Sequence, residues 1–260
     1  MKTLATVLLA GLLSAPAVQA QLGGIKLNSR LDQATKDAVG MATLSDAQIQ
    51  GYAKQSVTWM DEHNAVAGPN DPYTIRLTKV FGKHVAEDDL KLNFKVYKVT
   101  DVNAFACADG SVRVFSALMD MMTDDELLGI IGHEIGHVKN SDTKDAMKSA
   151  LKRSAIKNLA ASQSSTVNQL ARSELGALGE NIINASYSRK QESEADEYSY
   201  NFMKKHGYNV IGLATAFEKL DKLSEGAKKG TVDKLMSSHP DSAKRAKAVH
   251  DRAKKDGLEK

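Results

Sequence analysis

The segment Thr123–Asn140 reads TDDELLGIIGHEIGHVKN, and it decides the fold of this chain. Thr123 and Glu126 match a capping box, in which the two side chains satisfy free N–H groups at the start of a helix. The first turn also carries Asp124 and Asp125, and acids suit the positive end of the helix dipole. Enough apolar residues follow to bury most of a helix. The sequence therefore predicts a buried helix that begins after Thr123.

Three polar residues of this predicted helix, His133, Glu134 and His137, form the pattern H-E-x-x-H. Residues four apart share one helix face, so the two histidines can point at one metal ion. Glu134 adjoins the first histidine and can reach a water molecule on that ion. Zn²⁺ with these side chains is the working part of metal-dependent peptide hydrolases. The alternative is a pair of core histidines with backbone partners, which we do not favour because the full five-residue motif lies inside a capped, buried helix.

A three-ligand zinc site needs one more side chain and leaves one position open. Residues 188–198 read SRKQESEADEY, which lacks Pro and Gly and predicts a helix. Glu192 and Asp196 are four residues apart in it, so one can bind the metal while the other hydrogen-bonds a ligand imidazole. Spacing alone does not decide between the acids of this segment. The single cysteine, Cys107, is interpreted as a buried apolar residue.

H-E-x-x-H followed by S-R-x-x-E-x-E-A-D resembles the metallopeptidase family of the CAAX prenyl proteases, HtpX, the Oma-type proteases and BepA. Further segments resemble its LoiP-type subgroup of bacterial cell-envelope metalloproteases, and these are DVNAFA (101–106), ALMDMMTD (117–124), GLATAFEKL (212–220) and HPDSAKR (239–245). The resemblance covers residues 45–255. It implies one Zn²⁺ per chain with Glu192 as its third ligand, Asp196 in contact with a ligand histidine, and protein or peptide substrates.

The resemblance also brings His239 and Arg245 near the site, where they would stabilise the transition state or regulate the enzyme. It places Asn103, Ala104 and Phe105 at an exposed edge strand beside the site. Such an edge can hold an extended peptide by main-chain hydrogen bonds. We therefore expect the substrate to lie along this strand.

These residues together predict a zinc endopeptidase in which Glu134 is the general base and Asp196 the second acidic residue of the catalytic site. One alternative is a latent protease, in which His239 blocks the metal. Another is a chaperone-like module with a structural zinc ion. Structural zinc sites are usually closed by four protein ligands and often contain several cysteines, which this chain lacks.

Residues 1–20 have the features of a secretory signal peptide. Lys2 precedes an apolar run over residues 4–13, and small residues lead to a cleavage site after Ala20. The run is too short to span a membrane, and no later stretch is long enough. We expect export to the periplasm, with the outer-membrane surface and the medium as alternatives. Gln21 stands where a lipoprotein carries cysteine, so a lipid anchor is not supported.

The remaining residues are enough for one well-packed domain. We assign residues 45–260 to a single metallopeptidase domain and residues 21–44 to a segment that leads into it. The formal net charge of +3 implies no nucleic-acid partner. Basic residues cluster at 144–157 and 244–255, which predicts helices with a solvated basic face. The sequence does not indicate an oligomeric state.

Elsewhere the periodicity predicts a helix-rich chain with one small sheet. Residues 93–99 alternate between apolar and polar, as a half-buried strand does. The segments 104–107 and 112–115 flank a glycine-containing turn and predict a hairpin. Helices are expected at 45–66, at 73–84 and over most of the chain after Thr123. The expected fold class is mainly α with a small β-sheet (α+β), and the resemblance implies a zincin-like metallopeptidase with an H-E-x-x-H helix.

Overall fold

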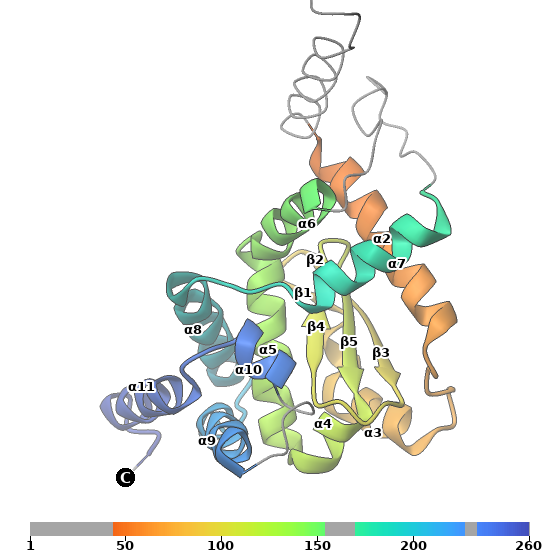
Figure 1. Cartoon of the computed structure of the whole chain (residues 1–260). Helices are drawn as coiled ribbons and strands as arrows, with labels where there is room; N and C mark the ends of the chain where they lie inside the picture. The colour runs from red at the N-terminus through yellow and green to blue at the C-terminus, as the bar shows by residue number, and fades with distance from the viewer. Residues whose placement is uncertain (1–43, 154–169, 227–232, 260) are drawn as a thin grey trace, which may run out of the picture.

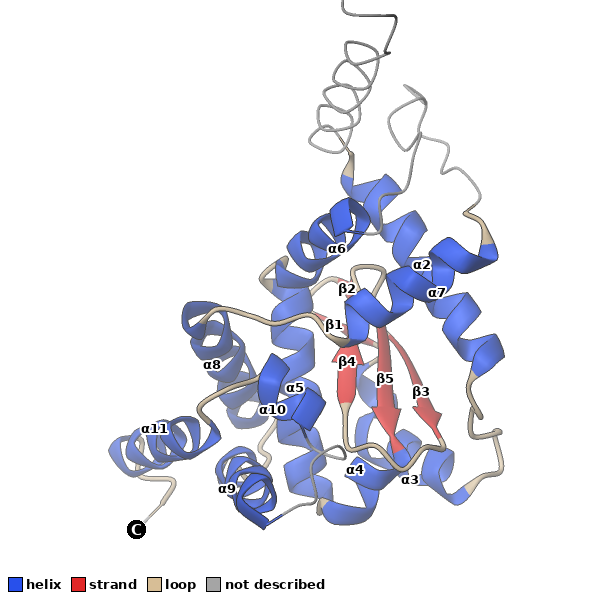
Figure 2. Ribbon diagram, viewed as in Figure 1, coloured by secondary structure: helices blue, strands red, loops and turns tan. Residues whose placement is uncertain are grey.

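A computed structural model gives the architecture and describes residues 44–153, 170–226 and 233–259 (Figure 1). The predicted signal peptide and almost all of the segment 21–44 lie outside the described residues. The elements in chain order are α2 (Asp46–His63), α3 (Pro72–Phe81), η1 (Gly82–His84), β1 (Ala86–Glu87), β2 (Leu90–Lys91), β3 (Asn93–Tyr97), β4 (Ala104–Ala106), β5 (Ser111–Phe115), α4 (Ser116–Met121), α5 (Asp124–Lys139), α6 (Asp142–Arg153), α7 (Arg172–Ile183), α8 (Arg189–Lys205), α9 (Ile211–Gly226), α10 (Asp233–Ser238) and α11 (Ser242–Lys255). Helices dominate and the strands form two small sheets, which confirms the predicted α+β class (Figure 2).

Side-chain caps set where three of the main helices begin. Ser45 precedes α2, Thr123 precedes α5 and Ser188 precedes α8. In each case the cap hydroxyl accepts a hydrogen bond from the backbone N–H three residues later, and the side chain at that later position accepts one from the cap backbone. The predicted capping box at Thr123 is therefore confirmed, and the H-E-x-x-H residues lie within one continuous helix.

The main sheet has the strand order β3–β5–β4. Strand β3 is parallel to β5, and β4 is antiparallel to it, which confirms the predicted hairpin. Its turn contains Gly110 with a φ of +85°, a backbone conformation that favours glycine. The separate β1–β2 hairpin turns through Asp88 and Asp89, both at positive φ. The sequence analysis did not predict this second hairpin, because its strands have only two residues each.

Helix α5 lies between strand β4 and the C-terminal helices α8 and α9 (Figure 1). Glycines let α5 and α8 approach closely. A Cβ atom on Gly136 would lie 2.9 Å from the Cα atom of Ala195, and one on Gly132 would lie 2.8 Å from the Oγ atom of Ser199. Larger side chains there would push the helices apart. This close approach brings the first turn of α8 to the histidines of α5.

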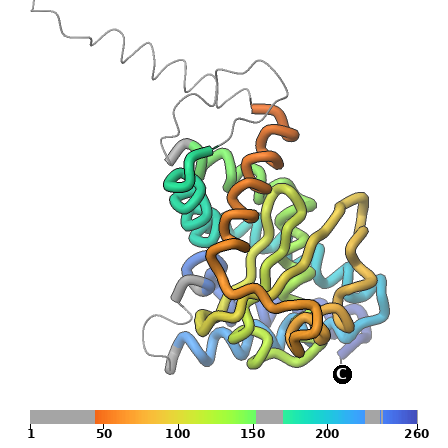
Figure 3. Tube along the Cα trace, turned by 90° about the vertical axis from the view of Figure 1, so that its right-hand side faces the viewer, coloured from red at the N-terminus to blue at the C-terminus, as the bar shows by residue number. Residues whose placement is uncertain are grey.

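Helices α2 and α7 pack together on the other face of the sheet (Figure 3). Their apolar residues form a core with Tyr97, Phe105 and Phe115 of the three strands. Cys107 is buried in the same core, as predicted. The sheet therefore separates this layer from the layer that contains α5, α8 and α9.

A buried ion pair joins α2 to the sheet. Arg113 is 2% exposed and donates from Nε to Asp61 Oδ1 at 2.8 Å and from Nη2 to Asp61 Oδ2 at 2.9 Å. Tyr97 and Lys95 donate to the same carboxylate, each at 2.7 Å. Burial alone would raise the pKa of Asp61, but the hydrogen bonds from Arg113, Lys95 and Tyr97 lower it. We call these four residues the Asp61 cluster.

The predicted basic face of α11 is solvated at Lys244, Lys247, Lys254 and Lys255. Arg245 differs, because it is buried and points toward α5 and α8. Among the described residues, no helix combines the length and the apolar character that crossing a bilayer requires.

Candidate metal centre

Helix α5 places the two histidines of the motif side by side in the interior. His133 is 2% exposed, and His137 is fully buried. Their Nε2 atoms lie 3.1 Å apart, and the rings meet edge to face. Two ring nitrogens therefore face each other in a region that water does not reach.

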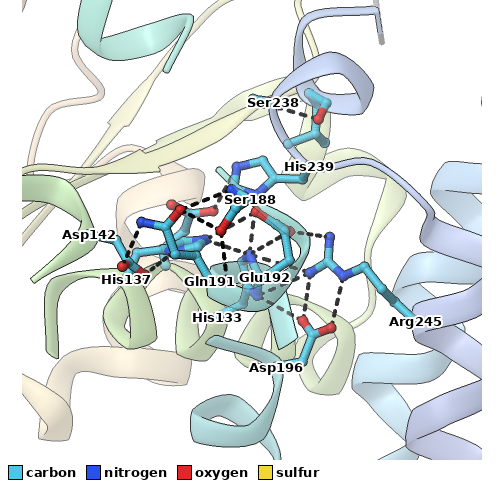
Figure 4. Close-up of polar contacts among 12 residues, drawn as sticks. His133, His137, Asp142, Ser188, Gln191, Glu192, Asp196, Ser238, His239 and Arg245 are labelled. Carbon is cyan, nitrogen blue, oxygen red and sulfur yellow. Dashed lines mark hydrogen bonds and ion pairs between the residues drawn. The ribbon is translucent and has the colours of Figure 1, made fainter. Parts of the chain in front are cut away.

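Glu192 in the first turn of α8 completes a three-residue group. Its Oε1 atom lies 3.4 Å from His137 Nε2, and its Oε2 atom lies 3.6 Å from His133 Nε2 (Figure 4). Burial alone would raise the pKa of Glu192, but hydrogen bonds from His137 and His239 hold it well below its ordinary value. The carboxylate is therefore ionised and able to bind a cation.

His239, in the loop after α10, supplies a fourth donor. Its Nδ1 atom lies 3.2 Å from His133 Nε2 and 3.0 Å from Glu192 Oε1. The four side chains His133, His137, Glu192 and His239 are all buried, and their donor atoms lie within 4.8 Å of one another. We call these four residues the metal centre.

The spacing of these donor atoms fits a tetrahedral metal ion. Ligand atoms about 2.0–2.1 Å from such an ion lie about 3.3 Å from one another. Five separations between nitrogen and oxygen atoms of these four residues range from 3.0 to 3.6 Å. Facing imidazole nitrogens cannot all be satisfied by protons, because one proton joins only two of them. A divalent ion with nitrogen and oxygen ligands satisfies the whole group.

A carboxylate holds the outer nitrogen of each ligand imidazole. Asp196 Oδ1 lies 2.9 Å from His133 Nδ1, and Asp142 Oδ2 lies 2.9 Å from His137 Nδ1. Such contacts fix the ring orientation and direct Nε2 toward the ion. Burial alone would lower the pKa of His137, but hydrogen bonds to Asp142 and Glu192 raise it to about 9.

Arg245 holds the acidic residues of α8 in place. Its Nη1 atom lies 2.6 Å from Glu192 Oε2, and its Nη2 atom lies 2.6 Å from Asp196 Oδ1. The guanidinium also stacks on Phe217, 4.1 Å from the ring centroid. A buried guanidinium that binds two carboxylates at once positions both of them. Arg245 thus belongs to the framework around the donor atoms.

Glu134 lies beside the metal centre but outside its donor set. It is 3% exposed, and its Oε1 atom lies 3.7 Å from His239 Nε2. Burial raises the pKa of Glu134 above its ordinary value. A buried carboxylate with a raised pKa is suited to accept and release a proton.

Two segments cover the metal centre. Tyr187, between α7 and α8, stacks on the His137 ring with centroids 3.8 Å apart and an interplanar angle of 16°. Its backbone N–H donates to Ser238 O, which joins this segment to the loop that carries His239. The cavity beside Glu134 holds about 10 Å³, room for about one water molecule. In the described part of the chain, these two segments therefore lie directly against the metal centre.

The structure brings together every predicted residue of the catalytic site and of the two motifs around it. It corrects one expectation. Strand β4 is an edge strand, but Asn103, Ala104 and Phe105 are buried rather than exposed. Phe105 packs in the core with residues of α2, α6 and α7, and Ala104 packs in the core that contains residues of α5.

The sequence analysis missed three residues that contact this site, Asp142, Tyr187 and Gln191. Gln191 was visible as the third residue after Ser188 in the capping box of α8, and its Nε2 atom donates to Asp142 Oδ1 at 2.9 Å. Asp142 follows the end of α5, where Ser141 has a φ of +69°. Helical spacing therefore could not place it opposite His137.

Comparisons with known proteins agree with this geometry. Residues 73–253 match the sequence profile of peptidase family M48. Metalloprotease LoiP and metalloprotease YcaL, both from Escherichia coli strain K12, are 43% and 41% identical to the chain over 83% of its length and 84% of theirs. The mitochondrial metalloendopeptidase OMA1 of Arabidopsis thaliana is 29% identical over 64% of the chain and 33% of its own length.

Proposed function

The chain belongs to peptidase family M48 and is a metalloendopeptidase, and we propose that its metal is Zn²⁺, held by His133, His137 and Glu192, with Glu134 as the general base. The observation that supports this best is the arrangement of three facing donor atoms beside a buried carboxylate. Two imidazoles and one carboxylate are the ligand set of zinc hydrolases that keep one position open.

In the proposed mechanism one side chain, Glu134, transfers a proton in two steps. Zinc, when bound, supplies Lewis acidity for the attacking water and for the substrate carbonyl. Glu134 accepts the proton of the water as it attacks and later delivers it to the leaving amine. Its raised pKa brings the carboxylate nearer to the pH at which it must do both. Asp196 and Asp142 keep the imidazoles oriented throughout.

The proposed substrate site lies along β4. The Nδ2 atom of Asn103 is buried and has no hydrogen-bond partner within the described residues. A buried amide without a partner costs free energy unless a ligand satisfies it. We propose that a substrate carbonyl accepts this hydrogen bond once the covering segment with Tyr187 has moved. Exported or misfolded envelope proteins are the substrates that fit the signal-like residues 1–20.

Replacing Glu134 with Gln tests the general base. We expect cleavage of an unfolded protein such as casein to fall by about 10²–10⁴-fold, while the zinc occupancy of the metal centre stays as in the wild type. A matched variant, Glu192→Gln, should instead lose zinc. Cleavage by Glu134→Gln at the wild-type rate would show that another group is the base. Unchanged zinc in Glu192→Gln would point to a different third ligand.

A second candidate function is that of a latent protease, and the position of His239 favours it. Its Nδ1 atom stands among the donor atoms, where a tetrahedral ion would otherwise bind water or substrate. We propose that His239 blocks the metal until its loop moves. His239→Ala should then raise the initial rate of casein cleavage, whereas His250→Ala, at a half-buried position of α11 where the imidazole contacts Glu218 and Glu259, should not. A lower rate with normal zinc content would assign His239 to the transition state instead.

A further inference from the structure

A second group of metal-binding side chains lies where the β1–β2 hairpin meets the end of α8. It consists of His84, Glu87 and His206, whose donor atoms all lie within 4.8 Å of one another. His84 and Glu87 are buried, and His206 is partly buried. Within the described ranges, this group and the metal centre are the two places where such side chains gather. We call these three residues the hairpin cluster.

Both imidazoles of the hairpin cluster point a nitrogen at one carboxylate. His84 Nδ1 lies 3.0 Å from Glu87 Oε2, and His206 Nε2 lies 3.1 Å from Glu87 Oε1. The two rings meet edge to face with centroids 4.6 Å apart. Two imidazoles and a carboxylate are the same donor set as His133, His137 and Glu192, and they suit Zn²⁺ and its neighbours in the first transition series.

Tyr208 holds the outer side of the His84 ring. Its hydroxyl lies 2.8 Å from His84 Nε2. A hydroxyl both donates and accepts, so it can accept the ring proton and leave Nδ1 with a free lone pair. Ligating imidazoles are usually held in this way. Burial also lowers the pKa of His84, which keeps the ring neutral and able to bind a cation.

Lys205 is the cation that now neutralises Glu87. Its Nζ atom lies 2.7 Å from Glu87 Oε1 and 3.1 Å from Asp88 Oδ1, and its side chain is 55% exposed. An exposed ammonium on a long side chain can turn into solvent and leave the Glu87 carboxylate to another cation. A divalent ion at this place would be bound by two imidazoles as well as by the carboxylate, whereas the ammonium of Lys205 binds carboxylates alone.

We propose that His84, Glu87 and His206 form a second binding site for a divalent transition-metal ion such as Zn²⁺, in which the ion displaces Lys205 from the Glu87 carboxylate. The ion would clamp the β1–β2 hairpin to the end of α8 opposite to Glu192. Asp88 of the same hairpin already accepts hydrogen bonds from Lys139 of α5 and Tyr198 of α8. A metal here would therefore stiffen the pair of helices that carries the metal centre.

Zinc stoichiometry tests this proposal. Equilibrium dialysis of the full chain with excess Zn²⁺ should give two ions per chain, and His206→Asn should give one. The double variant His133→Ala/His137→Ala lacks the metal centre and should still bind one ion, which it should lose when His206→Asn is added. A double variant that binds none overturns the second site and leaves the proposed function intact. Two ions in His206→Asn would overturn it as well.

A substitution at an exposed residue provides a second test if a variant of a buried residue fails to fold. Lys205→Gln removes the competing cation and should tighten binding of the second Zn²⁺ by about two- to fivefold. Lys204→Gln, which loses an exposed ion pair with Asp256 instead, is the matched control and should change nothing. An unchanged affinity in Lys205→Gln would contradict the proposal, because a hydrogen-bonded cluster without a metal predicts no tightening.

Discussion

The Asp61 cluster and the metal centre are both charged groups built around buried side chains, but they differ in how their atoms are paired. In the Asp61 cluster every close contact joins a donor to the carboxylate, and Arg113 also donates to the carbonyl oxygens of Asn93 and Val112. In the metal centre, ring nitrogens face ring nitrogens. The first group is complete within the protein. The second becomes complete only when a cation is added, and this difference separates a stabilising cluster from a functional one.

The largest expected effect is the loss of cleavage when a ligand of the metal centre is removed. Removing the His133 imidazole leaves too few ligands, so His133→Ala should lower the rate of casein cleavage by at least about 1000-fold, since metal catalysis contributes several kcal/mol. Prolonged dialysis against a chelator should do the same to the wild-type protein. Rate assays and metal analysis of the same preparations measure this. Substantial cleavage without bound metal would refute a metal-centred mechanism.

The Asp61 cluster should respond in stability rather than in catalysis. Asp61→Asn leaves the Arg113 guanidinium buried without its counter-ion, and removing one partner of a buried pair typically costs about 3–5 kcal/mol. We expect the free energy of unfolding to fall by about that amount, as measured by urea denaturation. Molecules that remain folded should cleave casein at close to the wild-type rate.

Glu62→Gln is the control for this substitution, because Glu62 is the next residue on α2 and is exposed. Its side chain is 58% exposed and lies 3.8 Å from Arg172. Such a surface pair contributes less than about 1 kcal/mol. Equal losses in the two variants would mean that burial of Arg113 does not govern the stability of this cluster.

Local signals made the helix of the metal centre predictable. Thr123 and Glu126 fix its start by hydrogen bonds within four residues, and the spacing of His133 and His137 follows from helix geometry alone. Glu192 required more than spacing, because several acids lie on the same segment. The resemblance to the family implies that Glu192 is the ligand. The close packing of α8 against α5 brings its carboxylate next to the two histidines.

Long-range packing made other features unpredictable. The burial of β4 depends on packing against helices α2, α5, α6 and α7, whose relative positions no short segment encodes. The Asp61 cluster unites residues of α2, β3 and β5, and a single sequence gives no sign of that pairing. The β1–β2 hairpin was missed because two-residue strands have no periodicity. All three features follow from which segments pack together in the folded chain, and the residue types of a short segment do not reveal that packing.

A smaller effect is expected at Asp142, which shares one property with each of the two clusters. This carboxylate accepts a hydrogen bond from Gln191 and holds His137, so it is fully paired but acts on a metal ligand. Asp142→Asn should weaken metal binding by about 10–100-fold, as measured by competition with a chelator. Asp145→Asn on the exposed side of α6 is the control. Equal affinities in the two variants would show that Asp142 does not position His137.

The smallest expected effect is the pH dependence of the Asp61 cluster. Because the pKa of Asp61 is lowered from 3.8 in the folded state, the folded protein binds fewer protons than the unfolded chain at acidic pH. The stability that Asp61 contributes is therefore fully present above pH 3.8 and is lost as the pH falls through its folded pKa. The difference in unfolding free energy between wild type and Asp61→Asn should stay constant from pH 7 to pH 5 and narrow below pH 3.8. A difference that persists at lower pH would mean that the charge of the Asp61 carboxylate is not what stabilises the cluster.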